Sequence, residues 1–269
     1  MTIDAARGRS FDAWADEYDR YRPTYPDELF ATIQARLELP ERPHVADLGA
    51  GTGRASLAMA ALGWRITAIE PGKPMLEQLR GRASEDGLVV ATVQASAEET
   101  GLDPASVDLA TAGQAFHWFD KERAVAEMAR IVRPGGGVAL FWNVRDEEAS
   151  PFVAAYHGLL EERFGSADTG RYLQAGRPSG QEATRRAFEG LASFAPLEKI
   201  ELRHQLAMSA EEFTGMAFTA SYIRALPDDE QVRLRGELAA LLAQHGHAGL
   251  QPFSVPYRVD LWITRRSNA

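Results

Sequence analysis

A glycine-rich turn between two apolar segments constrains this chain more than any other feature. The run Asp47-Leu48-Gly49-Ala50-Gly51-Thr52-Gly53 closes the segment His44–Leu48, which is mostly apolar and predicts a short buried strand. Small and apolar residues then predict a helix over Arg54–Leu62. Glycines lack a Cβ and let the backbone approach a ligand closely. A strand, a glycine turn and a helix in this order are typical of nucleotide-type binding sites in α/β folds.

The rest of the chain continues this alternation of strands and helices. Further strands are predicted over Arg65–Glu70, Leu88–Val93, Val107–Ala112, Val138–Trp142, Leu197–Leu206 and Val255–Thr264. Helices are predicted over Asp27–Leu37, Lys73–Arg82, Lys121–Val132 and parts of residues 151–195 and 210–246. The run Arg133–Gly137 is predicted to end the helix over Lys121–Val132 and to lead into the fifth strand. Such alternation is typical of a parallel sheet built from βαβ units.

We therefore expect an α/β fold with a Rossmann-like, seven-stranded, mostly parallel sheet flanked by helices. A helical cap is expected from the N-terminal segment and from C-terminal insertions. At roughly 150 residues per domain, the 269 residues predict a single domain, residues 1–269. Its cofactor-binding core is expected at about 40–145, with cap or substrate elements at about 10–38, 150–195 and 210–246.

Composition narrows the function classes. Lys and Arg number 29 and Asp and Glu 38, a net charge of −9, which argues against a broad nucleic-acid surface while leaving a local basic groove open. The chain has no cysteine, which excludes disulfides, thiolate metal sites and cysteine nucleophiles. No His/carboxylate cluster has metal-ligand spacing, so no metal is expected. With no apolar leader and no span-length segment, we expect a cytoplasmic protein without a membrane partner.

A carboxylate completes the nucleotide-type pattern. Glu70 ends the second predicted strand, where it can accept hydrogen bonds from both hydroxyls of a ribose. Arg54 occupies the place of the third glycine of the dinucleotide fingerprint, and Asp47 sets an anion where a pyrophosphate would lie. Both features favour a cationic ligand without phosphate, such as S-adenosylmethionine.

Three segments together resemble one enzyme superfamily. Asp47–Gly53 with Glu70 resembles the first two motifs of the class I S-adenosylmethionine-dependent methyltransferases. Tyr21–Pro26 (YRPTYP) resembles a "YRPxYP" segment, and Gln114–Phe119 (QAFHWF) resembles an "AxHWF" motif. Both belong to a small-molecule subgroup that includes trans-aconitate methyltransferase-like enzymes. The resemblance covers roughly residues 10–145 well and the C-terminal third mainly in layout.

The resemblance implies S-adenosyl-L-methionine as cofactor and assigns residues to it. The glycine loop and Asp47 would line its methionine part, Glu70 would hold its ribose, and Ser96 would stand where the family commonly has an aspartate toward the adenine. Tyr21 and Arg22 would cover its carboxylate end. The full expected cofactor set is Tyr21, Arg22, Asp47, Gly49, Ala50, Gly51, Gly53, Glu70, Pro71, Ser96, Ala97 and Gln114.

On the substrate side, His117 is the candidate catalytic residue. It follows the fourth predicted strand, where open α/β sheets bind ligands, and an imidazole suits proton removal near neutrality. A packing or hydrogen-bonding role fits equally well. The expected substrate-binding residues are Tyr18, His117, Trp118, Asn143 and Tyr222. Arg145, close to Asn143, could orient the substrate together with it, but an isolated arginine is interpreted first as a solvated charge. The apolar residues of Phe213–Ile223 are interpreted as helix core.

The predicted function is in-line transfer of a methyl group to an O, N or C atom of a small organic molecule by a monomer or homodimer. Gln114–His117 lacks the Asn/Asp-Pro-Pro-aromatic motif of nucleic-acid N-methylation, and C5 methylation of pyrimidines needs a cysteine. Two alternatives stay open. One is an NAD(P)-dependent oxidoreductase. The other is a non-catalytic scaffold that binds the cofactor, which the serine at position 96, in place of the family's usual aspartate, slightly favours.

Overall fold

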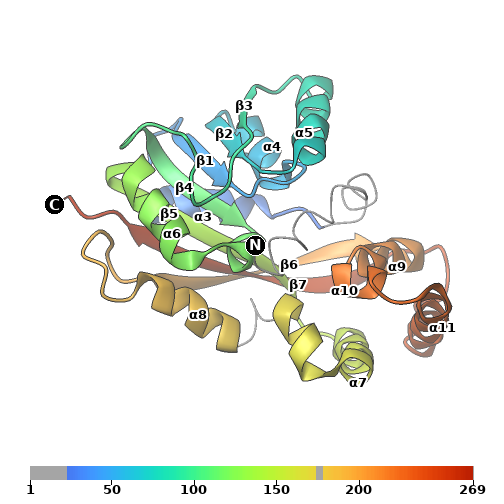
Figure 1. The fold of residues 1–269 in the computed structure, drawn as a ribbon. Coiled ribbons are helices and arrows are strands. Elements are labelled where there is room, and N and C mark those ends of the chain that lie inside the picture. Colours follow the sequence, from blue (N-terminus) through green and yellow to red (C-terminus); the bar gives the residue numbers. More distant parts are fainter. Residues whose placement is uncertain (1–22, 174–177, 269) are drawn as a thin grey trace.

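The computed structural model describes residues 23–173 and 178–268, which form a sheet of seven strands in the order β3-β2-β1-β4-β5-β7-β6 (Figure 1). The strands are β1 (His44–Leu48), β2 (Arg65–Ile69), β3 (Val90–Val93), β4 (Val107–Gly113), β5 (Val132–Arg145), β6 (Glu198–Met208) and β7 (Phe253–Arg265). Strands β1 to β5 pair in parallel, and β7 runs antiparallel to both of its neighbours. The expected Rossmann-like, mostly parallel sheet is confirmed.

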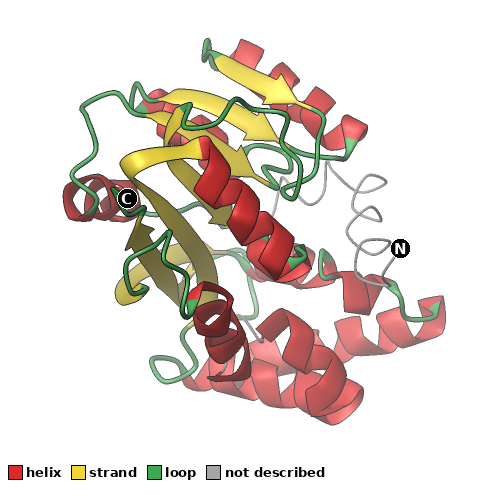
Figure 2. Cartoon of the chain, turned by 60° about the vertical axis from the view of Figure 1, so that its left-hand side comes forward, coloured by secondary structure: helices red, strands yellow, loops and turns green. Residues whose placement is uncertain are grey.

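Helices cover both faces of this sheet (Figure 2). They are α3 (Asp27–Arg36), α4 (Arg54–Ala61), α5 (Lys73–Glu85), α6 (Lys121–Ile131), α7 (Pro151–Leu173), α8 (Pro178–Phe188), α9 (Ala210–Phe218), α10 (Ser221–Arg224) and α11 (Asp228–Gln244), with a 3₁₀ turn, η2 (Phe116–Trp118). One apolar cluster joins α6 and α8 to the sheet, and a second joins α3 and α4 to the opposite face. Because both faces are covered, the parallel strands are apolar along nearly their whole length.

Local sequence explains several helix boundaries. Gly53 adopts a left-handed conformation (φ 87°) directly before α4, whose alanine-rich sequence has high helix propensity. Asp120 caps α6 by accepting a hydrogen bond from the backbone of Arg123. Ser209 and Glu212 form a reciprocal capping box at the start of α9.

Strand β5 is longer than the sequence pattern predicts. Helix α6 ends at Ile131, close to where the run Arg133–Gly137 was expected to end it, but β5 begins at Val132 and includes this run instead of starting at Val138. The register against β4 shifts between Val107 and Leu109, so the extra residues form an irregularity within the strand. A Cβ on Gly136 would lie 2.5 Å from the carbonyl oxygen of Asp108. Glycine serves close packing here, which the breaker rule does not distinguish from a turn.

A third apolar cluster, which we call the cap cluster, lies at one end of the sheet, where Figure 1 shows α7, α9, α10 and α11 together. It includes the buried side chains of Phe213, Met216, Phe218 and Ile223, so the expectation of core packing for this segment is confirmed. In the part of the chain that the structure describes, no helix is long and apolar enough to cross a membrane.

Candidate functional site

The glycine turn after β1 has the geometry that its sequence predicts. Gly49, Gly51 and Gly53 all have positive φ angles, of 67°, 56° and 87°, which favour glycine over any side chain. A Cβ on Gly49 would lie 2.8 Å from the Cβ of Ala115, and one on Gly53 would lie 2.6 Å from Leu79. Around Gly51, apart from its chain neighbours, no atom of the residues that the structure describes lies within 4 Å of that position. The first and third glycines therefore serve packing, while the middle one leaves space beside the backbone.

Glu70 holds this turn from the next strand. Its two carboxylate oxygens accept hydrogen bonds from the backbone N–H groups of Gly51 (3.0 Å) and Gly72 (2.9 Å). A carboxylate oxygen can accept more than one hydrogen bond, so these contacts fix its orientation and leave it able to bind hydroxyls. Ala50 lies inside the turn, where its N–H donates to the carbonyl of Ile69, and the exposed Pro71 follows Glu70.

Asp47 points into the protein beneath the turn. It is 1% exposed, and its carboxylate accepts hydrogen bonds from the hydroxyls of Ser56 (2.5 Å) and Thr111 (2.9 Å). Burial raises the pKa of Asp47 to about 6, although both hydroxyls act in the opposite direction. Its direct partners are thus α4 and β4, so Asp47 connects the turn to the sheet.

The predicted adenine side lies after β3. The side chain of Ser96 is partly buried, and its carbonyl accepts a hydrogen bond from the backbone N–H of Glu99 (3.3 Å). The side chain of Ala97 is buried in the cluster that α6 covers. Nearby, the side chain of Gln94 donates to the carbonyl of Pro71 (3.2 Å). These contacts bring the segments after β2 and β3 together at one edge of the sheet.

The segment Gln114–Phe119 lies beside the glycine turn. The Phe119 ring would lie 3.2 Å from a Cβ on Gly49, and it packs edge-on against Phe116. The rings of His117 and Trp118 are 4.7 Å apart, centroid to centroid. The structure therefore brings together two of the motifs that the sequence singled out, since β4 is the direct neighbour of β1.

Trp142, which the sequence analysis did not single out, is a partner of His117. Its indole N–H donates to Nδ1 of His117 at 3.3 Å. An indole nitrogen only donates, so Nδ1 accepts and the neutral imidazole carries its proton on Nε2. A tryptophan within a strand gives no sequence signal for this contact.

Gln114 and Asn143 take part in a second polar group. Gln114 has a positive φ of 55°, uncommon without glycine, and its side-chain amide donates to the carbonyl of Asn143 (3.0 Å). The Asn143 amide donates to the carbonyl of Thr24 (3.0 Å), and its oxygen contacts Nε2 of His204 at 3.1 Å. Burial lowers the pKa of His204. The sequence analysis treated His204 as one of several scattered histidines and missed this contact.

The expectation that Arg145 is a solvated charge is wrong. Its guanidinium lies 5.2 Å from the ring centroid of Tyr156 and 5.9 Å from that of Phe213, inside the cap cluster. Nη2 lies 2.7 Å from the sulfur of Met216, and Nε is buried without a hydrogen bond partner. The nearby Tyr222 is partly buried, with its ring 5.0 Å from that of Phe164.

Three predicted site residues, Tyr18, Tyr21 and Arg22, lie outside the described residues. Within the described ranges, no group of three or more His, Asp or Glu side chains could hold a metal ion. The arrangement therefore consists of a glycine turn, a carboxylate aimed at it and an aromatic segment beside it. All three lie at the carboxyl ends of neighbouring parallel strands, where open α/β sheets bind ligands.

Comparisons with known proteins agree with this arrangement. Residues 46–140 match the family model of the methyltransferase domain. An uncharacterized methyltransferase of Mycobacterium tuberculosis is 41% identical over 139 residues, 51% of this chain and 54% of that protein, so the match spans about half the length of that relative. An uncharacterized methyltransferase of Schizosaccharomyces pombe is 28% identical over 236 residues, which cover 87% and 88% of the two chains.

A solved structure extends the likeness to the whole fold. A protein of Anaeromyxobacter dehalogenans, provisionally assigned as a type II methyltransferase, superposes with a TM-score of 0.64 at 26% identity. The superposition covers 91% of this chain and 98% of that one. Residues 46–140 are therefore similar to the methyltransferase domain, and the fold is similar to that of a solved structure described as a methyltransferase.

Proposed function

We propose that this protein transfers a methyl group from S-adenosyl-L-methionine to a small organic acceptor. The observation that carries the proposal is the clamp of Glu70 on the backbone of Gly51 and Gly72, with open space beside Gly51. When bound, S-adenosylmethionine supplies a methyl group on a sulfonium sulfur, which leaves as a neutral thioether when the acceptor atom attacks in line. Because this leaving group is good, positioning of the acceptor contributes much of the rate.

The cofactor-binding residues in this proposal are those that the sequence predicted. Glu70 accepts hydrogen bonds from the ribose hydroxyls, and Gly49, Ala50, Gly51 and Gly53 bring the backbone to the methionine part. Ser96 and Ala97 flank the base, Tyr21 and Arg22 cover the carboxylate end, and Pro71 and Gln114 complete the cofactor-binding set. Asp47 supports the turn through Ser56 and Thr111.

His117 acts as a hydrogen bond donor to the acceptor in this proposal. The lone pair on Nδ1 accepts from Trp142, so Nε2 offers a proton to the acceptor and lacks the lone pair that a base needs. Trp118 lines the acceptor side beside His117, with Tyr18 and Tyr222. Asn143 supports that side by holding the carbonyl of Thr24.

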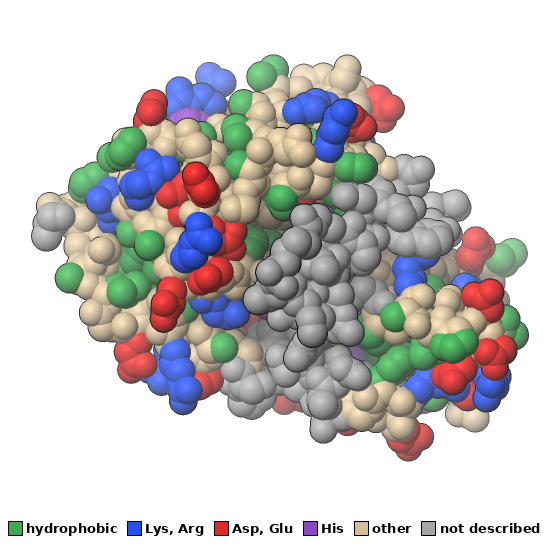
Figure 3. Space-filling view, in the orientation of Figure 1, with side chains coloured by type: hydrophobic (Ala, Val, Ile, Leu, Met, Phe, Trp, Pro, Cys, Tyr) green, Lys and Arg blue, Asp and Glu red, His purple; other side chains and the backbone are tan. Residues whose placement is uncertain are grey.

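The remaining features of the proposal concern the whole protein. It is a single domain in which residues 10–38, 150–195 and 210–246 form the cap, and it acts in the cytoplasm as a monomer or homodimer. Its acceptor is a small molecule, as in trans-aconitate methyltransferase-like enzymes. On the face that Figure 3 draws, acidic and basic side chains are interspersed, which supports the exclusion of a nucleic-acid partner.

Calorimetry with S-adenosylhomocysteine tests the cofactor assignment on the full chain. Binding to the unchanged protein and a loss of affinity in E70A are expected, while E77A, an exposed glutamate on α5, serves as control. No binding to the unchanged protein would reject the proposal, and binding of NADP instead would favour an oxidoreductase.

A tritiated-methyl assay across a metabolite extract, with product identification by mass, tests turnover and finds the acceptor. H117A is expected to keep its affinity for S-adenosylhomocysteine and to lose turnover. Cofactor binding without turnover on any acceptor would support a non-catalytic scaffold. The general-base role would be restored by a turnover that decreases as the pH is lowered and an imidazole becomes protonated, and that is lost in H117N as it is in H117A.

A further inference from the structure

Arg145 is the last residue of β5, at the carboxyl edge of the sheet. It pairs across the strands with Tyr257 of β7, and its side chain enters the cap cluster between α7 and α9. Its guanidinium lies near the rings of Tyr156 and Phe213, contacts the thioether of Met216 and forms a hydrogen bond with the phenol of Tyr257. A thioether is only a weak hydrogen bond acceptor.

No acidic side chain of the described ranges forms an ion pair with Arg145. Asp146 is next in sequence, but its carboxylate faces Arg203 of β6 (3.6 Å). By contrast, the similarly enclosed Arg258 lies 2.7 Å from the carboxylate of Asp260. Taking a charge out of water without a partner is costly, so buried charges are normally paired. Arg145 departs from this rule.

The polar groups around Arg145 do not neutralise it. Burial acts to lower the pKa of Arg145, but the phenols of Tyr156, Tyr257 and Tyr222 act more strongly together, and the pKa is raised. Phenols are uncharged at neutral pH, since their own pKa is about 10. They can solvate the guanidinium, but its positive charge persists inside an otherwise apolar cluster.

We propose that Arg145 is a specificity-determining residue that binds a carboxylate group of the methyl acceptor. This inference rests on the proposed function and names the acceptor class. A guanidinium matches a carboxylate in a bidentate arrangement, and one cation balances its single charge, whereas a phosphate monoester carries close to two. β5 lies two strand spacings, roughly 10 Å, from β1 and its glycine turn. The anchored carboxylate and the methylated atom are therefore different parts of the acceptor.

The first test needs no ligand. If Arg145 serves binding, then R145M removes an unpaired charge from an apolar cluster at similar volume, and the melting temperature stays the same or rises. R123M removes an exposed arginine from α6 for which no ion pair is seen in the described ranges, and it is the matched control for the change in net charge. A fall of the melting temperature in R145M by several degrees, with no such fall in R123M, would show a structural role and reject the inference.

The second test measures the preference for carboxylates by calorimetry. The full chain, saturated with S-adenosylhomocysteine, is titrated with hexanoate, benzoate and phenylacetate, and with the corresponding amides. At least one carboxylate is expected to bind tenfold more tightly than its amide. R145M should abolish this preference, R145K should retain part of it, and R123M should retain all of it.

Two results would overturn the inference. One is the absence of any carboxylate preference in the unchanged protein, or its persistence in R145M. The other is a loss of affinity for S-adenosylhomocysteine in R145M, which would assign Arg145 to the carboxylate of the cofactor. Failure of the unchanged protein to bind S-adenosylhomocysteine rejects the proposed function instead, and the carboxylate titrations, repeated without it, still test Arg145.

Discussion

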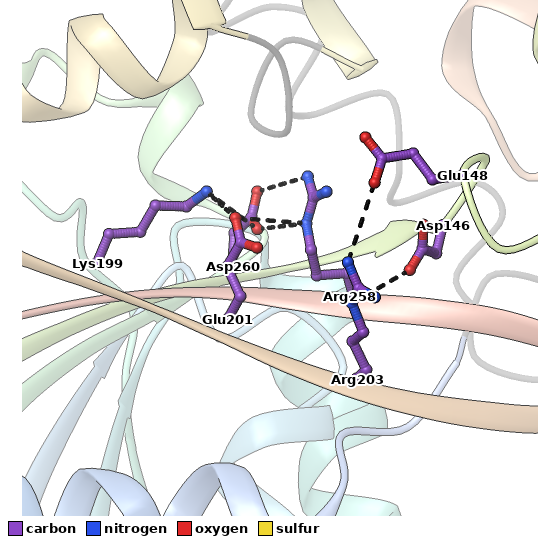
Figure 4. Close-up of polar contacts among 7 residues, drawn as sticks. All are labelled: Asp146, Glu148, Lys199, Glu201, Arg203, Arg258 and Asp260. Atoms are coloured by element: carbon purple, nitrogen blue, oxygen red, sulfur yellow. Dashed lines mark hydrogen bonds and ion pairs between the residues drawn. The ribbon is translucent and has the colours of Figure 1, made fainter.

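Two fully buried carboxylates in this molecule have opposite surroundings. Asp260 on β7 is 0% exposed and lies 2.7 Å from Arg258 and 3.5 Å from Lys199, in the charged network that Figure 4 shows on one face of β6 and β7. Asp47 on β1 is 1% exposed, and its carboxylate accepts hydrogen bonds from the hydroxyls of Ser56 and Thr111. One carboxylate is neutralised by cations and the other is not.

The same contrast holds for arginines. Arg258 of β7 is paired, whereas Arg145 of β5, which lies across from the neighbouring Tyr257, has no acidic partner in the described ranges. Charges on the β6–β7 face therefore neutralise one another and serve the fold. Asp47 and Arg145, toward the carboxyl ends of their strands, form no ion pair with the residues that the structure describes, at a cost in stability. Such positions are where functional groups with shifted pKa values tend to lie.

The largest effect is expected from breaking the paired side. R258M leaves the Asp260 carboxylate buried with only Lys199 and should lower the free energy of unfolding by about 3–5 kcal/mol. Urea denaturation measures this loss. The double variant R258M/D260L removes both charges and should recover most of it. A loss of unfolding free energy below about 1 kcal/mol in R258M would show that the ion pair of Arg258 and Asp260 contributes little to the stability of this face.

The stability contribution of Asp47, which has hydroxyl partners and, among the described residues, no cation, should decrease as the pH rises, whereas that of an ion-paired carboxylate decreases as the pH falls. The pKa of Asp47 is raised from 3.8 to about 6 in the folded protein, so the folded state keeps its proton to higher pH than the unfolded chain does. The contribution of Asp47 is thus most favourable below pH 4, and roughly 3 kcal/mol of it is lost as the pH rises to about 6.

D47N has no proton to lose and isolates this contribution. Relative to the unchanged protein, its stability should rise between pH 4 and pH 6, whatever the constant offset between the two. E127Q is the control. The pKa of Glu127 is lowered to about 2, first by its hydrogen bond with Arg130, so its contribution is lost only as the pH falls from about 4.5 toward 2. A stability difference for D47N that is flat between pH 4 and 6 would contradict the raised pKa.

A smaller effect is expected at the glycine turn. E70Q keeps the shape of the side chain but removes its charge, and it should weaken binding of S-adenosylhomocysteine by about 1–3 kcal/mol, roughly 5- to 150-fold. Its melting temperature should change little in the absence of ligand. A large loss of stability with unchanged affinity would assign Glu70 to the fold and weaken the contrast between the two regions.

The smallest effect on the site is expected for W142F. It removes one hydrogen bond to Nδ1 of His117, and because the smaller ring also leaves space in the core around this buried position, the effect is measured on the imidazole and not on stability. Nitrogen chemical shifts of the imidazole measure the tautomer directly. The unchanged protein should show the proton on Nε2, and W142F should show a mixture. A mixture in both proteins would mean that the indole does not fix the tautomer.

Local patterns predicted the cofactor side of the molecule well. The turn after β1, helix α4 and the acid at the end of β2 follow one another in sequence, and short-range rules describe each of them. The other side depends on contacts between distant residues. Asn143 meets His204 across 61 positions, and Trp142 meets His117 across 25. No spacing rule encodes such pairs, since they arise only when β5 and β6 enter one sheet.

Two errors have the same origin. The glycines of Arg133–Gly137 resemble a turn in sequence, but Gly136 is there because the backbone of Asp108 approaches closely. Arg145 resembles a surface charge, but the cap helices that enclose it come from segments further along the chain. In both cases tertiary packing decides, and its partners cannot be read from the residue's own neighbourhood.

The pairing of Met208 with Phe253 has a consequence for evolution. These residues end β6 and begin β7, so helices α9, α10 and α11 leave the sheet and return to it at adjacent positions. This segment can be lengthened, shortened or exchanged without a change of register in any strand, because its two ends lie side by side. Insertions are tolerated at such places. Since Met216 of α9 contacts Arg145, a lineage could acquire a new acceptor by replacing one contiguous segment while it keeps the glycine turn intact.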